Sequence, residues 1–304
     1  IHFIGIGGIS MSGLAEILMR EGFRVSGSDS HESELTDHLA AAGAKVMYGQ
    51  AAANITDDID LVVYTAAVHT DNPEYAEVVR RGIPMMTRAE LLGQIMKNYG
   101  EAIAISGTHG KTTTTSMVTE ILLAAEKDPT ISVGGILHSI GGNIRVGGPE
   151  LFVTEACEYT NSFLSFFPTM EIILNIEADH LDFFKDLDDI RHSFRLFAEK
   201  LDEKGLLIIN RDIKNYEEIS GGLPCRVVTF GHSKESDYSA ADITYDAFAR
   251  PTFTLVEQGK AAGTITLGVP GEHNVYNALA AIATAKALGI PDTAIADGLL
   301  HFTG

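Results

Sequence analysis

Short apolar runs alternate with segments of helical hydrophobic periodicity from the start of the chain. β-branched residues are frequent in the runs, as in strands, whereas apolar residues recur every three or four positions in the segments between them, as in amphipathic helices. The predicted strands are 1–6, 23–27, 45–48 and 60–64, and the predicted helices are about 10–21, 33–42 and 73–81. Because strands that alternate with helices form parallel sheets, we expect an α/β domain with helices on both faces of its sheet.

A second series of strands follows a helix that runs from Arg88 to about Tyr99. These strands are apolar runs of the kind found in buried sheets, at 102–106, 151–155, 171–175, 206–210 and 226–230. The length of 304 residues also exceeds the usual size of one domain, roughly 100 to 200 residues. We therefore predict two domains, 1–97 and 98–304.

The pattern changes between about residues 241 and 268, where polar and apolar positions alternate. Three short strands are predicted, at 243–246, 253–256 and 264–267. We expect them to extend the second sheet with antiparallel strands. An alanine-rich helix at 275–288 follows, and Gly289 and Pro291 end it.

The composition excludes several classes of function. The chain has 41 acidic and 22 basic residues, a net charge of −19, which disfavours nucleic-acid binding. No apolar run approaches the roughly 20 residues that cross a bilayer, so we expect no membrane association. The two cysteines, Cys157 and Cys225, support neither a disulfide framework nor a paired-cysteine metal site. Without a signal-peptide pattern, a cytoplasmic location is expected.

A glycine-rich loop follows the first predicted strand, Gly5-Ile-Gly7-Gly8-Ile-Ser10-Met-Ser-Gly13, and Asp29 closes the second strand. Glycines between a strand and a helix let the backbone approach a diphosphate, and an acidic residue at the end of the second strand can reach a ribose hydroxyl. Ser10 stands where the dinucleotide-binding pattern requires its third glycine. A nucleotide site and a purely structural turn therefore remain open, and so does a nicotinamide dehydrogenase.

A second glycine-containing loop is more specific. The segment Gly107-Thr-His-Gly-Lys-Thr-Thr113 lies between the predicted strand 102–106 and a helix. In phosphate-binding loops of this kind, backbone N–H groups wrap the phosphates, the lysine neutralises their charge, and the next hydroxyl holds Mg²⁺. Lys111 and Thr112 occupy those positions. Ile105 stands where the general pattern has its first glycine, but the context still predicts phosphate binding.

Polar residues follow the next strands of the second series. Glu155 ends one strand and can coordinate Mg²⁺ as a hard oxygen ligand, and Asn175 ends the next. In parallel sheets, ligands gather at these carboxyl ends. His180 is an unusual ligand for magnesium, so its chemistry alone favours a structural role. Asn274, near the start of the last helix, is a candidate N-cap and equally a candidate ligand-binding amide.

Together these segments resemble the Mur ligases, the ATP-dependent amide-forming enzymes of peptidoglycan precursor synthesis. The resemblance rests on the first glycine loop and on four further motifs: Gly107-Thr-His-Gly-Lys-Thr-Thr113, Glu155-Ala-Cys-Glu158, Asn175-Ile-Glu-Ala-Asp-His180 and Gly271-Glu-His-Asn-Val-Tyr-Asn277. It spans essentially the whole chain. It implies a Rossmann-like N-terminal domain that binds a UDP-sugar, followed by a central ATPase domain of P-loop type.

The resemblance also implies roles for individual residues. Those facing the UDP-sugar are Gly7, Gly8, Ile9, Ser10, Asp29, Ser30, the loop from Thr65 to His69, and Arg88. Those binding ATP are Gly107, Thr108, His109, Gly110, Lys111, Thr112, Thr113, Asn175, His273, Asn274 and Asn277. Lys111, Glu155 and His180 are the expected catalytic residues, and Thr112, Glu155 and His180 the expected Mg²⁺ ligands.

Within the family, the chain is most similar to the branch that joins L-alanine to the carboxylate of UDP-N-acetylmuramate through an acyl phosphate. Phe194 falls about where other Mur ligases carry a carbamylated lysine, which favours this alanine-adding branch. Three alternatives remain: a ligase that attaches a whole peptide to UDP-N-acetylmuramate in recycling, a nicotinamide dehydrogenase, and a non-catalytic nucleotide-binding regulator.

Family members carry a third, C-terminal domain that helps to bind ATP and the amino acid. The chain ends at Gly304, before such a domain, so we expect a trimmed protein that binds its UDP-sugar but ligates poorly or not at all. We expect it to be a monomer or a weak homodimer.

Overall fold

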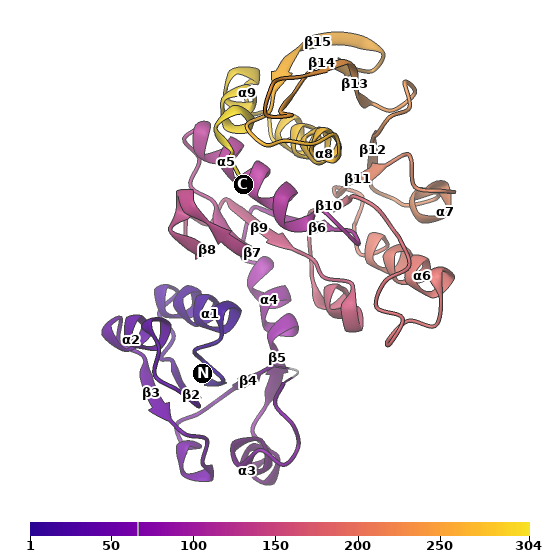
Figure 1. The fold of residues 1–304 in the computed structure, drawn as a ribbon. Helices are drawn as coiled ribbons and strands as arrows, with labels where there is room; N and C mark the ends of the chain where they lie inside the picture. The colour runs from indigo at the N-terminus through magenta and orange to yellow at the C-terminus, as the bar shows by residue number, and fades with distance from the viewer. Residues whose placement is uncertain (66) are drawn as a thin grey trace. The chain divides into compact units, whose positions relative to one another are not determined.

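A parallel five-stranded sheet organises the first part of the chain (Figure 1). The computed structural model describes residues 1–65 and 67–304, which divide into two units, Ile1–Ile95 and Met96–Gly304. In the first unit the strand order is β3-β2-β1-β4-β5 and every pairing is parallel. The strands are β1 (His2–Ile4), β2 (Ser26–Asp29), β3 (Lys45–Tyr48), β4 (Val62–Tyr64) and β5 (Met85–Thr87).

Helices connect these strands in the order that the sequence predicts. They are α1 (Ile9–Arg20), α2 (Glu34–Ala41), the 3₁₀ turn η1 (Ala52–Asn54), α3 (Pro73–Arg81) and α4 (Arg88–Met96). The bounds of α3 follow from its caps: the Asn72 side chain accepts hydrogen bonds from the first turn, Pro73 opens the helix, and Gly82 ends it at φ +67°.

The second unit holds a ten-stranded mixed sheet in the order β15-β14-β13-β12-β11-β10-β6-β9-β7-β8. Its middle strands pair in parallel, and an antiparallel hairpin or meander closes each edge. The strands are β6 (Glu101–Ser106), β7 (Thr130–Leu137), β8 (Gly142–Arg145), β9 (Leu151–Glu155), β10 (Met170–Ile173), β11 (Leu206–Asn210), β12 (Arg226–Phe230), β13 (Tyr238–Tyr245), β14 (Pro251–Glu257) and β15 (Lys260–Thr266).

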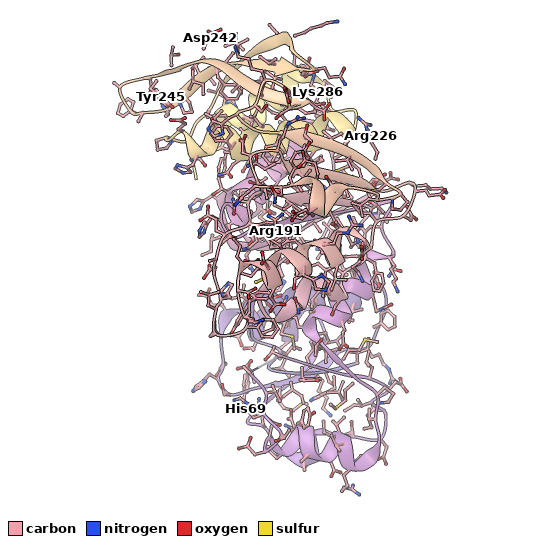
Figure 2. The ribbon with its side chains drawn as sticks, turned by 90° about the vertical axis from the view of Figure 1, so that its right-hand side faces the viewer. His69, Arg191, Arg226, Asp242, Tyr245 and Lys286 are labelled. Carbon is pink, nitrogen blue, oxygen red and sulfur yellow. The ribbon has the colours of Figure 1, made fainter. Side chains whose placement is uncertain are left out.

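Helices α5, α8 and α9 share one large apolar core with this sheet. All alanines of α8 except Ala287 are buried. A Cβ on Gly298 of α9 would lie 2.6 Å from the Cα of Ile121, so this small residue lets α5 and α9 approach closely. Lys286, labelled in Figure 2, belongs to α8. It pairs with Glu257 at 2.6 Å and with Asp292 at 2.7 Å. The helices of this unit are α5 (Lys111–Ala124), η2 (His138–Ile140), η3 (Tyr159–Ser165), α6 (Leu187–Ala198), α7 (Glu217–Ser220), α8 (His273–Ala287) and α9 (Asp292–His301).

The predicted α/β architecture is confirmed, as is the antiparallel extension, which is β13 to β15. The pattern did not predict β5, the β7–β8 hairpin, α6 or α9. Among the described residues, no helix combines the length and apolar content that crossing a bilayer takes.

Candidate phosphate and nucleotide site

The loop between β6 and α5 has a backbone that glycine alone tolerates. Gly107 and Gly110 lie at φ +138° and +85°, and a Cβ on Gly110 would stand 2.6 Å from Oδ1 of Asn277. The loop leads directly into the first turn of α5, whose N–H groups have no partners within the helix. Free N–H groups and the helix dipole favour an anion there, so the geometry suits a phosphate.

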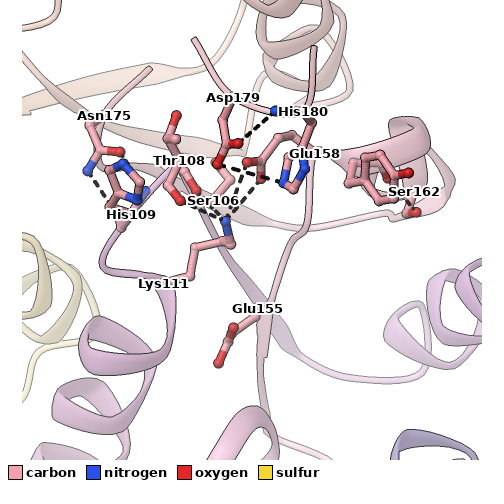
Figure 3. Close-up of polar contacts among 12 residues, drawn as sticks. Ser106, Thr108, His109, Lys111, Glu155, Glu158, Ser162, Asn175, Asp179 and His180 are labelled. Atoms are coloured by element: carbon pink, nitrogen blue, oxygen red, sulfur yellow. Dashed lines mark hydrogen bonds and ion pairs between the residues drawn. The ribbon is translucent and has the colours of Figure 1, made fainter. Parts of the chain in front are cut away.

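Lys111 lies across this loop. Its Nζ donates to the carbonyl oxygens of Gly107 at 2.5 Å and Thr108 at 3.3 Å and pairs with Oε2 of Glu158 at 3.1 Å (Figure 3). The Glu158 side chain is 2% exposed and that of Lys111 15%, so this ion pair is largely shielded from water. Sequence reasoning assigned no role to Glu158. The sequence feature that could have indicated a role for Glu158 is its place in the motif, as a second glutamate three residues after Glu155.

Glu155 ends β9, the strand beside β6. Its carboxylate accepts hydrogen bonds from Oγ1 of Thr112 at 3.2 Å and from the N–H of Gly134 at 2.5 Å. A Cβ on Gly134 would lie 2.9 Å from that carboxylate, so the approach requires glycine in β7. One hydroxyl and one carboxylate oxygen side by side are the hard donors that Mg²⁺ prefers, and this pair fits the ion.

The third expected metal ligand lies elsewhere. Figure 3 shows His180 beside Asp179, whereas Glu155 lies on the other side of Lys111. The N–H of His180 donates to Oδ1 of Asp179 at 2.7 Å, and its ring packs on Tyr159 with centroids 4.6 Å apart. Among the described residues, no three or more His, Cys, Asp or Glu side chains form a metal-binding group.

Asn175 clamps the phosphate loop from the neighbouring strand end. Its Oδ1 accepts from the N–H of His109 at 2.8 Å and its Nδ2 donates to the His109 carbonyl at 2.9 Å. The Thr108 N–H also donates to the Asn175 carbonyl at 3.2 Å. Because both ends of the amide are occupied, the contacts of Asn175 fix the loop backbone.

A cavity of about 230 Å³ adjoins the loop. Five residues expected to bind ATP line it, namely His109, Gly110, Asn175, His273 and Asn277. The lining also includes four residues with hydrogen-bonding side chains that sequence reasoning missed, namely Asn210, Asp212, His232 and Tyr276. Asn210, Asp212 and His232 lie outside the motifs, and Tyr276 lies within the Gly271–Asn277 motif, where sequence reasoning gave it no role.

Two of the missed residues form a stacked pair. The His232 and Tyr276 rings lie 3.7 Å apart between centroids, and Nδ1 of His232 lies 2.7 Å from Oδ2 of Asp212. Burial, with Glu272, Asp212 and Tyr245 nearby, raises the pKa of Tyr276 to about 12, so its hydroxyl stays protonated. The cavity therefore offers a flat aromatic wall beside hydrogen-bonding groups.

Asn274 is not an N-cap, which makes that hypothesis wrong. Helix α8 begins at His273, with Glu272 at the cap position, so Asn274 lies in the first turn. Its Nδ2 donates to the Pro270 carbonyl at 2.7 Å, and its Oδ1 accepts from Nδ2 of Asn277 at 3.0 Å. It thereby orients Asn277, whose Oδ1 faces Gly110.

A second cavity, of about 630 Å³, lies at the carboxyl ends of the strands in the first unit. It brings together six expected UDP-sugar residues: Gly7, Gly8, Asp29, Ser30, Thr65 and His69. Gln50 and Asn72, which sequence reasoning missed, also line it. Oδ2 of Asp29 accepts from the Gly7 N–H at 2.8 Å, so this carboxylate holds the glycine loop in place.

Three residues expected to face the UDP-sugar, Ile9, Ser10 and Arg88, are not among the residues that line that cavity. Arg88 donates to Oγ of Ser10 at 3.1 Å, and Ile9 is mostly exposed at the start of α1. Ala66, within the expected loop from Thr65 to His69, lies outside the described residues. In the second unit, Phe194 is fully buried in α6 and packs edge-to-face on Phe163.

Comparisons with known proteins agree along the whole chain. A model described as the Mur ligase middle domain matches residues 105–285, and one described as the Mur ligase family catalytic domain matches residues 1–100. A UDP-N-acetylmuramate–L-alanine ligase from Lachnospira eligens is 66% identical over 305 residues, which cover 100% of this chain and 66% of that protein. The chain thus spans just under two thirds of the length of this relative.

Two solved structures are similar over the full chain. A UDP-N-acetylmuramate–alanine ligase from Thermotoga maritima gives a TM-score of 0.82 at 34% identity and is covered to 68%. A UDP-N-acetylmuramate:L-alanyl-γ-D-glutamyl-meso-diaminopimelate ligase from Neisseria meningitides gives 0.87 at 28% identity and is covered to 98%.

Proposed function

Because this chain belongs to the Mur ligase family, we propose that it serves the ATP-dependent ligation of L-alanine to the carboxylate of UDP-N-acetylmuramate. The reaction forms a C–N bond in peptidoglycan precursor synthesis. The proposal rests on the charged groups at the carboxyl ends of β6 and β9. There Lys111 and Thr112, at the end of the phosphate loop, lie close to Glu155. The 66% identity to a ligase of that name supports the choice of substrates.

The two units take different ligands in this proposal. Residues 1–97 bind the UDP part of the sugar nucleotide, in the cavity that Gly7, Gly8 and Asp29 line. The free N–H groups at the start of α1 suit its diphosphate. Ser30, Thr65 and His69 face the same ligand, and Ile9, Ser10 and Arg88 border the loop that holds it.

Residues 98–304 bind ATP and Mg²⁺. Gly107 to Thr113 wrap the phosphates, Lys111 offsets their charge, and Thr112 and Glu155 hold the metal ion, which supplies further positive charge. His180, the third expected ligand, lies beside Asp179 and apart from this pair, so it would reach the ion only if the loop that follows β10 moved. The 230 Å³ cavity receives the adenine, between the stacked ring of Tyr276 and the Asn277 side chain. His273 lines it, and Asn274 acts by orienting Asn277.

The chemistry follows from charge. A carboxylate oxygen of UDP-N-acetylmuramate attacks the γ-phosphorus of ATP and ADP leaves, which gives an acyl phosphate. Both reactants are anions, so Lys111 must offset the charge that gathers on the phosphoryl oxygens. The L-alanine amine then attacks the acyl carbon, loses a proton, and expels phosphate as the amide forms. Water must be kept away because an acyl phosphate hydrolyses readily.

Glu158 holds the Lys111 ammonium in place for this step. A lone ammonium on four methylenes samples many rotamers, and the buried carboxylate restricts them. The pair also keeps the loop close to neutral before a nucleotide with several negative charges arrives. We therefore add Glu158 to the site as the group that positions Lys111.

Isothermal titration of this chain with UDP-N-acetylmuramate, Mg²⁺–ATP and NADH tests the proposal. We expect binding of the first two, each with one site, and none of NADH. Binding of NADH without the UDP-sugar would instead support a nicotinamide dehydrogenase and overturn the ligase proposal. Phosphate release with L-alanine, measured on a chain extended to the full length of its relatives, then tests turnover.

A second candidate is the attachment of a whole peptide to UDP-N-acetylmuramate. One observation favours it: the fold matches the peptide-adding ligase from Neisseria meningitides with a TM-score of 0.87, against 0.82 for the alanine ligase from Thermotoga maritima. The same phosphate-release assay separates the two candidates. Turnover with the tripeptide L-alanyl-γ-D-glutamyl-meso-diaminopimelate but not with L-alanine would replace our first proposal.

We also place the protein in the cytoplasm, where ATP is supplied, as a monomer or weak homodimer. Sedimentation velocity across a range of concentrations checks the second point. A tight dimer at nanomolar concentration would contradict it.

A further inference from the structure

We propose that the Gln50 side chain recognises the uracil ring of the sugar nucleotide as a hydrogen-bond donor, and that Asn72 fixes this polarity. The inference rests on the proposed function, in which the first unit holds the UDP part of the ligand. Gln50 and Asn72 line the 630 Å³ cavity together with Gly7 and Gly8 of the glycine loop. Because the diphosphate is placed at the glycine loop, the two amides are left to face the uridine.

The cap of helix α3 determines how the Asn72 amide is turned. Its Oδ1 accepts hydrogen bonds from the N–H groups of Glu74 at 2.9 Å and Tyr75 at 3.1 Å. Only the oxygen of a side-chain amide can accept, so these two bonds assign the oxygen and leave Nδ2 for another partner. The orientation of Asn72 is therefore set when the helix forms, before any ligand binds.

That orientation passes to Gln50. Nδ2 of Asn72 donates to Oε1 of Gln50, so the Gln50 oxygen is occupied. Nε2 of Gln50, which carries two N–H donors, is the group that remains for a ligand. Among the residues that the structure describes, Nε2 has no hydrogen-bond partner of its own. The cavity therefore presents a donor at this position, and the cap of α3 determines that it is a donor.

The backbone beside Gln50 is also held. The Gly49 N–H donates to the Asp29 carbonyl at 2.8 Å, and the Gly49 carbonyl accepts from Nδ2 of Asn54 at 3.0 Å. Gly49 lies at φ +87°, which glycine adopts readily, so the chain can turn directly after β3. Both the polarity and the position of the Gln50 amide are thus fixed in advance, which lowers the cost of ordering it on binding.

Uracil and cytosine differ at an edge that such a donor can contact. Position 4 of uracil is a carbonyl, which accepts hydrogen bonds, whereas position 4 of cytosine is an amino group, which donates them. An N–H of Gln50 can therefore bond uracil, but it meets a second donor in cytosine. A mismatch of this kind leaves two polar groups unpaired, which costs more than the loss of one bond. The amide should therefore favour uridine nucleotides over cytidine nucleotides.

Isothermal titration of this chain with UDP and CDP tests the inference, because the two ligands share their ribose and diphosphate. The readout is the ratio of the CDP to the UDP dissociation constant. We expect the unmodified chain to bind UDP about 10- to 100-fold more tightly than CDP.

Gln50→Glu should reverse this preference. One carboxylate oxygen can still accept from Asn72, and the other then presents an acceptor to the base, which suits the cytosine amino group and repels the uracil carbonyl. The added charge opposes both diphosphates alike, so it cancels in the ratio. Gln94→Glu is the matched control, since it makes the same change in the same unit, at an exposed position of α4 that is not among the described residues lining the cavity. It should keep the ratio of the unmodified chain.

Asn72→Asp tests the polarity without changing Gln50. Aspartate caps helices about as well as asparagine, so α3 should be kept. The new carboxylate offers Gln50 an oxygen in place of an N–H, so the Gln50 amide should turn, donate to it through Nε2 and leave Oε1 facing the ligand. We expect the preference for UDP to be lost. A purely structural bond between the two side chains predicts no change in the ratio.

The outcomes distinguish this inference from the function on which it rests. Equal affinity of the unmodified chain for UDP and CDP would overturn the inference alone, as would a ratio that Gln50→Glu leaves unchanged. A ratio that survives Asn72→Asp would reject the role of Asn72. A chain that binds neither UDP nor UDP-N-acetylmuramate would overturn both proposals. Circular dichroism checks that each variant folds, and if Asn72→Asp does not, the Gln50→Glu ratio decides.

Discussion

The two glycine loops are built alike but carry different charge. The first follows β1, the central strand of its sheet, and the second follows β6, an interior strand of the other sheet. Each loop is held by a side chain at the end of a neighbouring strand, Asp29 of β2 for the first loop and Asn175 after β10 for the second. The first clamp is an anion that bonds one backbone N–H. The second is a neutral amide that bonds an N–H and a carbonyl.

This difference fits two tasks. Among the described residues that line the first cavity there is no lysine or arginine, so its loop would hold a diphosphate through backbone dipoles alone. The second loop adds Lys111 over its own carbonyl oxygens, with Glu158 behind it. Binding needs only complementary donors, whereas phosphoryl transfer needs charge where the transition state develops it. The comparison indicates that the first loop binds a ligand, whereas the second loop takes part in the reaction.

The variant Lys111→Ala should give the largest effect and tests whether the two loops have different roles. Phosphate release by a full-length version should fall by roughly two to three orders of magnitude, because a charge that stabilises the phosphoryl oxygens is lost. UDP-N-acetylmuramate binding, measured by isothermal titration, should stay within about twofold. Lys260→Ala, an exposed lysine on β15, is the matched control and should change neither. Equal loss of turnover and UDP-sugar binding would show that the loops are not separate sites.

Glu158→Gln should have the next largest effect. The amide keeps the shape of the side chain but loses the charge that pairs with Lys111 at 3.1 Å. We expect turnover to fall about 10- to 100-fold, with little change in UDP-sugar binding, because an ammonium left without a buried partner is no longer held in one place. Glu203→Gln, on the surface of the same unit, should behave like the unmodified protein. Unchanged turnover would remove Glu158 from the site.

Asp29→Asn addresses the other loop. The amide can still accept from the Gly7 N–H, but the charge-assisted bond of 2.8 Å becomes a neutral one. UDP-N-acetylmuramate binding should weaken by about tenfold, while Mg²⁺–ATP binding stays the same. Asp37→Asn, on the exposed face of α2, is the control. A loss of ATP binding as well would contradict the assignment of separate ligands to the two units.

The central architecture could be predicted from the sequence because its strands fall within apolar runs that periodic helices separate. The bounds of α3, β9, β11 and β12 agree to the residue. The edges could not be predicted. Strand β5 has only three half-buried residues, and the β7–β8 hairpin lies in a glycine-rich segment without alternation. Helix α9 restarts directly after the proline that ended the predicted α8.

The site residues also divide into those that could be predicted from the sequence and those that could not. Lys111, Thr112 and Glu155 could be predicted as neighbours because a loop motif and a strand end place them at one edge of the sheet. Glu158 escaped because a glutamate gives no sign of its burial in the sequence. His232 and Tyr276 escaped because their contact joins segments 44 residues apart (276 − 232), which no local pattern records.

A pair of buried glutamates, one in each unit, extends the comparison to stability. In the first unit, burial alone would raise the pKa of Glu74. Contacts with His2, Ser28 and Asn54 outweigh burial, however, and hold that pKa below the ordinary 4.5. In the second unit, burial raises the pKa of Glu171 well above 4.5, only partly offset by Lys200. Neither oxygen of Glu171 has a hydrogen-bond partner among the residues that the structure describes.

The same substitution at these two positions should therefore change the free energy of unfolding in opposite directions. Of the predicted variants, these two should affect ligand binding least. The Glu74 contribution is present above pH 4.5 and is lost as the pH falls through its lowered pKa. The Glu171 contribution is present below pH 4.5 and is lost as the pH rises through its raised pKa. In urea unfolding at pH 7, Glu74→Leu should destabilise by about 1–3 kcal/mol, because Ser28 and Asn54 lose their acceptor, and Glu171→Leu should stabilise by a similar amount. A loss of stability with Glu171→Leu at pH 7 would show that this carboxyl has a partner there, and that charge is held as firmly in the second unit as in the first.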